Sequence, residues 1–389
     1  MKADVDPESR IAFSQLAILP GEKLPRRKWI MPGFLLRGHV TELVASSGAG
    51  KSSLALAIAC HLAAGRNFGR FRIDQRYRVA IATLEEDDDE LNRRLSAIAM
   101  KYGLDIDDYV LRKHLMTVKC RTSEGLCLAR ADRKGVVNRT SDMKELERRL
   151  FNERIDVLSL DPLAELWQGN ENDNSQVGAV LRVIRSMARC NEMAVLLNHH
   201  TGKGTVEPGN IDAARGASSG AAAVRFLYTL TKASKDDATA LGLNEEEAKH
   251  LMRLDLAKGQ YRASAHDNEA DFFRFHSIDL GNGNECENAD HVGVLFPEVR
   301  RVGGDIGRGD KAERVFMNLM ELYSKRRAPL SVAESSRDYA PRKFFSNENR
   351  EGLTQPELTR AMFALIDKGV IVVRQIGTGT RTKSVLEIA

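Results

Sequence analysis

The segment Ala45–Ser52 constrains this chain more than any other part of its sequence. It has the pattern A-x-x-x-x-G-K-S, follows an apolar stretch at Val40–Val44, and opens an alanine-rich stretch at Ser53–Ala64 that Gly65 should end. A strand, a glycine-containing turn and a helix in this order are typical of a phosphate-binding P-loop. Backbone N–H groups of such a loop converge on phosphates, and the helix N-terminus adds its positive dipole end.

Two side chains of this loop are expected to complete the phosphate site. Lys51 should reach the β- and γ-phosphates of a nucleotide, and the Ser52 hydroxyl should ligate Mg²⁺. Ala45 stands where glycine is commoner, and a small residue suffices there if its φ is negative. The alternative is a small-residue turn that only joins a strand to a helix. We predict that ATP and Mg²⁺ are bound by Ala45, Ser46, Ser47, Gly48, Ala49, Gly50, Lys51, Ser52 and Ser53.

Length and composition indicate two domains and no membrane span. The chain has 389 residues, 42% of them hydrophobic, which is more than one typical domain needs. It contains no run of about 18 or more apolar residues, and the N-terminus lacks the apolar core of a signal peptide. Five cysteines are scattered without a zinc-ligand spacing. We therefore expect a cytoplasmic protein with free thiols that does not associate with a membrane.

The excess of basic over acidic residues lies entirely in the C-terminal part of the chain. The formal net charge is +4, and residues 310–389 alone hold 14 Lys and Arg against 10 Asp and Glu. This distribution fits a small segment that contacts nucleic acid, attached to a neutral core.

Apolar strand-like runs alternate with helical patterns from Gly38 to Leu230. The helical stretches Asp89–Met100, Asp142–Phe151 and Ser175–Cys190 carry apolar residues on one face, and Asp142-x-x-Glu145 should form a capping box. This alternation predicts an α/β fold with βαβ units and a mainly parallel sheet covered by helices. The expected strands are Val40–Val44, Tyr77–Leu84, Leu115–Val118, Ile155–Leu160 and Met193–Leu197.

From Arg225 onward the pattern changes to shorter strands separated by turns. These strands should extend the sheet in antiparallel fashion, with an acidic helical stretch at Asp236–His250 between them. The expected strands are Phe226–Leu230, Leu251–Leu256, Phe272–Leu280 and Val292–Leu295.

The C-terminal part has the pattern of a winged-helix-like domain. Helices at Lys311–Lys325 and from Thr354 precede a hairpin of Val370–Gln375 and Ser384–Ile388 with basic residues near its turn. The alternative is a packing or oligomerisation module of the same shape. We expect an N-terminal arm at 1–30, an ATPase core at 31–300, a Gly-rich linker at 301–310 and the winged-helix-like domain at 311–389.

Acidic residues at strand ends supply the other groups that an ATPase needs. Val157–Asp161 is an apolar run that ends in an acid, which is a Walker B pattern, so Asp161 should hold the Mg²⁺ shell. Glu85, or as second choice Glu86, ends another strand and should polarise the attacking water. The alternative is an acidic helix start, because three aspartates follow.

Two adjacent histidines, His199 and His200, end a further strand. They should point to opposite faces, so a shared metal site is not expected. We predict that His199, or as second choice His200, senses the γ-phosphate; the alternative is a buried structural histidine.

The polar loops downstream carry further candidates for binding. Arg215 could act in trans as an arginine finger, and Lys203 could meet nucleic-acid phosphates. Trp167 could stack on a base or anchor the core.

Taken in order, these motifs resemble those of the RepA-type hexameric helicases, which are RecA-like ATPases of plasmids, phages and integrated elements. The resemblance extends roughly over residues 25–300, with Trp29–Gly33 similar to that family's entry segment. The segments that carry it are Ala45–Ser52, Thr83–Glu86, Leu160–Leu163, Leu197–Lys203 and Arg215–Ser219.

The resemblance implies a RecA-like core in a ring of six subunits, with ATP sites between neighbours. By the same resemblance Glu85 is the catalytic base, His199 the γ-phosphate sensor and Arg215 the finger. Loops near 165–175 and 201–214 would face single-stranded DNA in a central channel, and duplex DNA is a possible partner of the C-terminal domain.

Three functions remain open on the sequence. The first hypothesis is an ATP-dependent DNA helicase or translocase that serves replication of a mobile element. The second is a DNA-binding ATPase that does not unwind, such as a recombination mediator or an element regulator. The third is a DNA-binding regulator that nucleotide only assembles.

Overall fold

The computed structural model describes most of the chain. The chain divides into two compact units. One unit consists of Met1–Ala233 with His250–Glu298, and the other of Ser234–Lys249 with Val299–Ala389. The described residues are 18–105, 108–120, 125–200, 207–211, 223–261, 269–284, 287–298, 308–325, 328–333, 336–367, 370–376 and 383–388.

The described part of the first unit is built on one mixed sheet. Its strand order is β14-β13-β12-β11-β3-β10-β8-β4-β5. The strands from β11 to β5 run parallel, and β12, β13 and β14 continue the sheet antiparallel. Both the mainly parallel sheet and its antiparallel extension are therefore confirmed. The strands are β3 (Val40–Ala45), β4 (Val79–Thr83), β5 (Leu115–Thr117), β8 (Val157–Asp161), β10 (Ala194–His200), β11 (Phe226–Lys232), β12 (Leu251–Gly259), β13 (Asp271–Asp279) and β14 (His291–Glu298).

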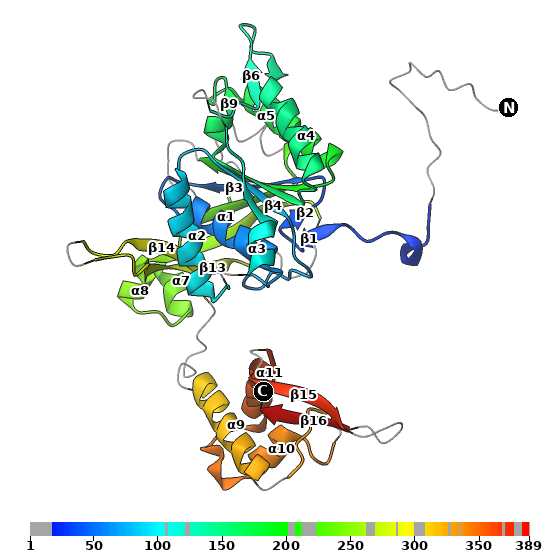
Figure 1. The fold of residues 1–389 in the computed structure, drawn as a ribbon, viewed down its shortest axis with the longest axis vertical. Coiled ribbons are helices and arrows are strands. Elements are labelled where there is room, and N and C mark those ends of the chain that lie inside the picture. Colours follow the sequence, from blue (N-terminus) through cyan, green and yellow to red (C-terminus); the bar gives the residue numbers. More distant parts are fainter. Residues whose placement is uncertain are drawn as a thin grey trace, which may run out of the picture. The chain divides into compact units, whose positions relative to one another are not determined.

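Helices cover both faces of this sheet (Figure 1). Successive strand residues point to opposite faces, so Leu43 of β3 joins one hydrophobic cluster and Val44 joins the other. The cluster with Leu43 includes α1 (Lys51–Ala64), α2 (Asp88–Tyr102) and α3 (Tyr109–His114), and the cluster with Val44 includes α4 (Ser141–Asn152) and α5 (Asn174–Cys190). Because both faces are covered, the parallel strands are apolar almost throughout.

Helix ends follow local capping chemistry, with one correction to the sequence analysis. Gly65 ends α1 in the left-handed conformation, at φ 67°, as predicted. Asp142 does not begin α4: the N-cap is Thr140, whose hydroxyl accepts from the Met143 N–H. The Asp142 carboxylate instead accepts from the Cys127 N–H at 3.1 Å. A hydroxyl at N-cap satisfies a free helix N–H as well as a carboxylate does, so the sequence pattern did not separate the two sites.

Short elements that the sequence did not predict complete the first unit. They include a three-stranded sheet in the order β7-β6-β9. Trp167, in β9, is 6% exposed and packs within the cluster that contains α4 and α5. Of its two predicted roles, the structure therefore supports the core anchor. These elements are η1 (Gly21–Lys23), β1 (Trp29–Met31), β2 (Leu35–Leu36), β6 (Ala129–Ala131), β7 (Val137–Arg139), η2 (Leu163–Leu166) and β9 (Trp167–Gln168).

The second unit has its own hydrophobic core, made by helices and a two-stranded hairpin. Thr354 lies at the start of α11, and its backbone N–H donates to the Glu357 carboxylate at 2.7 Å, as its capping pattern predicts. Helix α9 begins at Arg308, earlier than the predicted Lys311, so the end of the predicted linker is helical. The elements are α7 (Lys235–Ala240), α8 (Glu245–Lys249), α9 (Arg308–Lys325), α10 (Ala340–Phe345), η4 (Glu348–Arg350), α11 (Gln355–Asp367), β15 (Ile371–Ile376) and β16 (Lys383–Ile388).

None of the helices in the described ranges combines the length and the apolar character that a bilayer crossing requires.

The burial of Trp167 gives a test of its role. Trp167→Ala should lower the free energy of unfolding by about 3–5 kcal/mol, because a large buried ring leaves a cavity. Urea unfolding measures this loss, and Trp167→Phe, which keeps an aromatic ring, should lose less. An unchanged unfolding midpoint with weaker binding of single-stranded DNA would show instead that the ring stacks on a base.

Candidate active site

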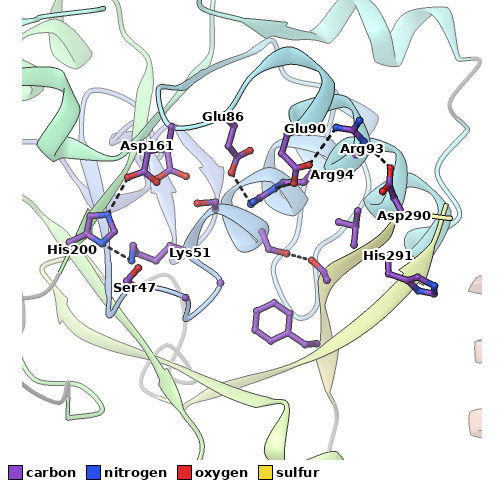
Figure 2. A pocket seen from close by; sticks show the side chains of 18 residues that line it. Ser47, Lys51, Glu86, Glu90, Arg93, Arg94, Asp161, His200, Asp290 and His291 are labelled. Carbon is purple, nitrogen blue, oxygen red and sulfur yellow. Dashed lines mark hydrogen bonds and ion pairs between the residues drawn. The ribbon is translucent and has the colours of Figure 1, made fainter. Parts of the chain in front are cut away.

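The predicted P-loop lies in a cavity of about 510 Å³ at the carboxyl ends of the parallel strands (Figure 2). The register aligns those ends, since His200 of β10 pairs with Ala45 of β3 and Asp161 of β8 pairs with Thr83 of β4. Helix α2 and the strands β13 and β14 form the other walls. The lining residues are Ser47, Gly48, Gly50, Lys51, Ser52, Ser53, Glu85, Glu86, Glu90, Arg93, Arg94, Asp161, His200, Phe275, Asp290, His291, Val292 and Gly293.

Two glycines give the loop its shape. Gly48 and Gly50 have φ values of 76° and 93°, which side-chain-bearing residues rarely adopt. A Cβ at Gly50 would also stand 2.5 Å from Phe275 Cζ and 2.9 Å from Leu295 Cδ1, so the loop packs directly on β13 and β14. Ala45 is not among the residues with positive φ. A small residue is therefore tolerated at Ala45, as the sequence analysis required.

Lys51 lies on the first turn of α1 with its ammonium group inside the loop. Nζ donates to the carbonyls of Ala45 and Ser46, at 2.9 and 3.1 Å, and is 3.4 Å from Nδ1 of His200. Burial lowers the pKa of Lys51, whereas the carboxylates of Asp161 and Glu85 raise it. A buried cation held by two backbone carbonyls is well placed to exchange them for phosphate oxygens.

Ser52 and Asp161 supply oxygen ligands of the kind that Mg²⁺ prefers. Both line the cavity, and Asp161 is 7% exposed at the end of β8. Among the described residues, no group of three or more His, Cys, Asp or Glu side chains forms an all-protein metal site. This donor set fits Mg²⁺, which proteins commonly bind through one or two side chains together with phosphates and water.

The neighbouring Ser53 has a different task from the one predicted. Its hydroxyl accepts from the Leu295 N–H at 3.2 Å and lies 3.4 Å from the Gly293 carbonyl. Ser53 therefore ties α1 to β14, although it also lines the cavity. Of the other predicted loop residues, Ala45, Ser46 and Ala49 do not line it, and the two alanines are buried.

Glu85 and Glu86 both reach the cavity, in different environments. The Glu85 side chain is 55% exposed, its carboxylate lies 3.9 Å from Nε2 of His200, and it is close enough to act on Lys51. The Glu86 side chain is 13% exposed and pairs with Arg94 at 2.8 Å. Burial raises the pKa of Glu86, and Arg94 opposes this effect. Glu85 stays our prediction for the base, because it is closer to the phosphate-binding lysine and is not held by an arginine.

The histidine assignment needs correction. His199, the first choice, is 5% exposed, and its Nδ1 lies 2.6 Å from a carboxylate oxygen of Glu42, which is 0% exposed. His200, the second choice, lines the cavity next to Lys51. Adjacent strand residues point to opposite faces, so only one histidine can face the phosphates. Burial, and then Lys51, lower the pKa of His200 and favour its neutral form.

The sequence analysis missed one side of the cavity. Arg93 and Arg94 project from α2, and Asp290 and His291 lie at the start of β14 (Figure 2). Arg93 pairs with Asp290 at 3.1 Å and so connects α2 to that strand. Arg93 and Arg94 lie only eight residues after Glu85 and Glu86, on a helix that the sequence predicts, so their place near the cavity could have been inferred. The β14 residues carried no such signal, because only the antiparallel extension brings them to the P-loop.

Two predicted residues cannot be placed. Arg215 and Lys203 lie outside the described residues.

A scan of protein families agrees with this geometry. The model of a family described as AAA domain matches residues 7–206, just over half of the chain. This chain belongs to the AAA domain family. It is thus a P-loop ATPase of the AAA type. No curated protein matched the chain.

Substitution of the two glutamates separates the base from its neighbour. Glu85→Gln should retain ATP binding and lower turnover about a hundredfold or more, because a general base contributes at least that much. Glu86→Gln, the matched control, should mainly loosen the contact with Arg94. Steady-state turnover with fluorescent-ATP binding measures both. An active Glu85→Gln enzyme beside an inactive Glu86→Gln enzyme would reverse the assignment.

The two histidines should fail in different ways. His200→Ala should lower ATP turnover on the order of 10²-fold with an unchanged unfolding midpoint, because it removes a group that faces the phosphates. His199→Ala should instead cost about 3 kcal/mol of stability, because it leaves the buried Glu42 carboxylate unpaired. Thermal unfolding and turnover assays on both variants give the answer. A stable, inactive His199→Ala protein would restore His199 as the sensor.

Proposed function

We propose that this AAA-type ATPase is an ATP-dependent DNA helicase or translocase that serves replication of a mobile element. The observation that carries the proposal is that Lys51, Asp161, Glu85 and His200 meet in one cavity from four different strand ends. Their order along the chain is that of the RepA-type helicases, which the sequence resembles. The segment proposed to contact DNA follows His200 directly in the sequence, so the state of the phosphates can affect that segment.

The residues of the cavity divide the work of ATP hydrolysis. The P-loop and Lys51 bind the phosphates, and Ser52 and Asp161 would hold Mg²⁺. When bound, Mg²⁺ neutralises phosphate charge. Glu85 orients a water molecule and accepts its proton, and His200, neutral at pH 7, contacts the γ-phosphate through one ring nitrogen.

A ring of six subunits would complete the site. Glu85 is half exposed in the single chain, and a neighbouring subunit that covers the cavity would exclude water from it. Arg215 from that neighbour is our proposal for the arginine finger. Single-stranded DNA would pass through the centre of the ring, between loops near 165–175 and 201–214.

The C-terminal unit is proposed to be a winged-helix-like domain that meets duplex DNA. Helices α9, α10 and α11 precede the two-stranded hairpin of β15 and β16, in the order that such a domain needs. Arg374 of the hairpin pairs with Glu387 at 3.0 Å, so this arginine is partly neutralised. Any DNA contact by the hairpin would therefore depend mainly on its other basic residues.

The response to DNA decides between a motor and the other functions. ATP turnover should rise severalfold with single-stranded DNA, and the protein should displace a strand from a forked duplex, because hydrolysis drives the channel loops. Lys51→Ala should abolish both activities, since it removes the phosphate-binding cation. Stimulation without displacement would identify a DNA-binding ATPase that does not unwind. The absence of turnover would leave nucleotide as an assembly ligand.

The same assay tests the ring. Inactive Lys51→Ala and inactive Arg215→Ala proteins should regain turnover when mixed, since some interfaces then combine an intact P-loop with an intact finger. Subunit mixtures that stay inactive, although native mass spectrometry shows mixed rings, would exclude a finger supplied in trans.

A further inference from the structure

A second charged surface lies at the opposite edge of the sheet from the ATP cavity. It is formed by the outer face of α5 and by the chain just before β3 and β11, and the two edges are about 20 Å apart along the strands. Arg182 and Arg189 are exposed on α5, and Arg185 and Arg225 are partly exposed. We call Arg182, Arg185, Arg189 and Arg225 the amino-edge arginines.

These arginines are close together and largely without acidic partners. In the described part of the chain, no carboxylate lies within ion-pair distance of any of the four. Arg185 donates to the Ala223 carbonyl at 3.1 Å. Two carboxylates occur at the same edge, but Glu192 pairs with Lys28 at 2.9 Å and Asp156 pairs with Arg37. The amino-edge arginines thus keep a net positive charge.

The pKa of His39 responds to three of these guanidinium groups. Burial is the main cause that lowers the pKa of His39, and Arg225, Arg189 and Arg185 lower it further. The turn before β3 packs on the end of α5, since a Cβ at Gly38 would lie 3.7 Å from Arg189 Cγ. Three of the four cations therefore lie near a single side chain.

An aromatic ring continues this surface. Tyr261 stacks on His39 with ring centroids 5.6 Å apart, and the Arg27 guanidinium lies 4.8 Å from the centre of the Tyr261 ring. Beside the arginines of α5 is a hollow of about 520 Å³. Guanidinium groups bind phosphate oxygens through two parallel N–H donors, so this surface suits phosphate groups.

We propose that the amino-edge arginines bind the phosphate backbone of a nucleic-acid strand, at a site separate from the ATP cavity and from the channel loops. Arg182 and Arg189 lie about 10 Å apart along α5, which matches a polymer of phosphates better than a single anion. This inference rests on the proposed function in one respect: the proposed role on DNA is the reason for choosing DNA as the first ligand to test.

Charge reversal at two exposed positions tests the proposal. The full-length variant Arg182→Glu/Arg189→Glu should bind a fluorescent single-stranded oligonucleotide at least about tenfold more weakly at low salt, and the slope of log K against log salt should fall by about 0.7 per lost phosphate contact. Arg182→Lys/Arg189→Lys should retain most of the salt dependence, because it keeps the charge. Anisotropy titrations without nucleotide measure these quantities, with the annealed duplex as a second probe.

The matched control reverses two exposed cations elsewhere, Arg112→Glu/Lys144→Glu, and should leave binding unchanged. Equal losses in both double variants, or an unaltered slope in the first, would overturn the proposal. Displacement of the oligonucleotide by inorganic phosphate at equal ionic strength would also overturn the proposal, because it indicates a site for small anions. A change in oligomer mass that accounts for the loss would show an interface between copies. These titrations need no ATP turnover, so their failure leaves the ATPase assignment standing.

Discussion

The parallel alignment of β3, β10, β8 and β4 is the constraint on which the whole site depends. Their registers bring Ala45 level with His200 and Thr83 level with Asp161, and the Leu84 N–H donates to the Asp161 carbonyl at 3.1 Å. Four segments far apart in sequence therefore end at one edge. A slip of one residue would move every side chain of a strand to the opposite face and disrupt the close packing of both apolar faces, so the register is strongly fixed.

Charge compensation at that edge explains why the cavity is stable and still able to react. The partly buried Lys51 is offset by Asp161 and Glu85, and Glu86 is held by Arg94. On the other face, His199 covers the Glu42 carboxylate below the same strand ends. One histidine is thus buried against Glu42 and its neighbour lines the cavity, because strand residues alternate between faces.

Local sequence patterns predicted a large part of this structure. Short-range periodicity and the positions of glycines were enough to predict the P-loop, Asp161, the strands and the antiparallel extension. Alternation on β10 was also recognised, but it could not say which face held the phosphates, so His199 was preferred over His200. To choose between the two histidines one must know which group each ring contacts. The partner of His199 is Glu42, which lies far away in sequence and could not be identified from local patterns.

Other errors had the same cause, namely contacts between distant segments. Ser53, which was expected to bind nucleotide, bonds to β14. The wall of β14 and α2 arises only when the antiparallel strands fold back onto the loop. The start of α4 was wrong for a local reason, because Thr140 and Asp142 both satisfy capping rules.

An experimental structure with a non-hydrolysable ATP analogue and Mg²⁺ tests the central claim most directly, which is that one cavity brings together the phosphate-binding loop, the Mg²⁺ ligands, the base and the histidine sensor. The account predicts phosphates within the P-loop, Lys51 and His200 in contact with the γ-phosphate, Mg²⁺ on Ser52, and Glu85 facing the phosphate from the water side. Phosphates bound elsewhere, or a γ-phosphate contacted by His199 with His200 turned away, would contradict it.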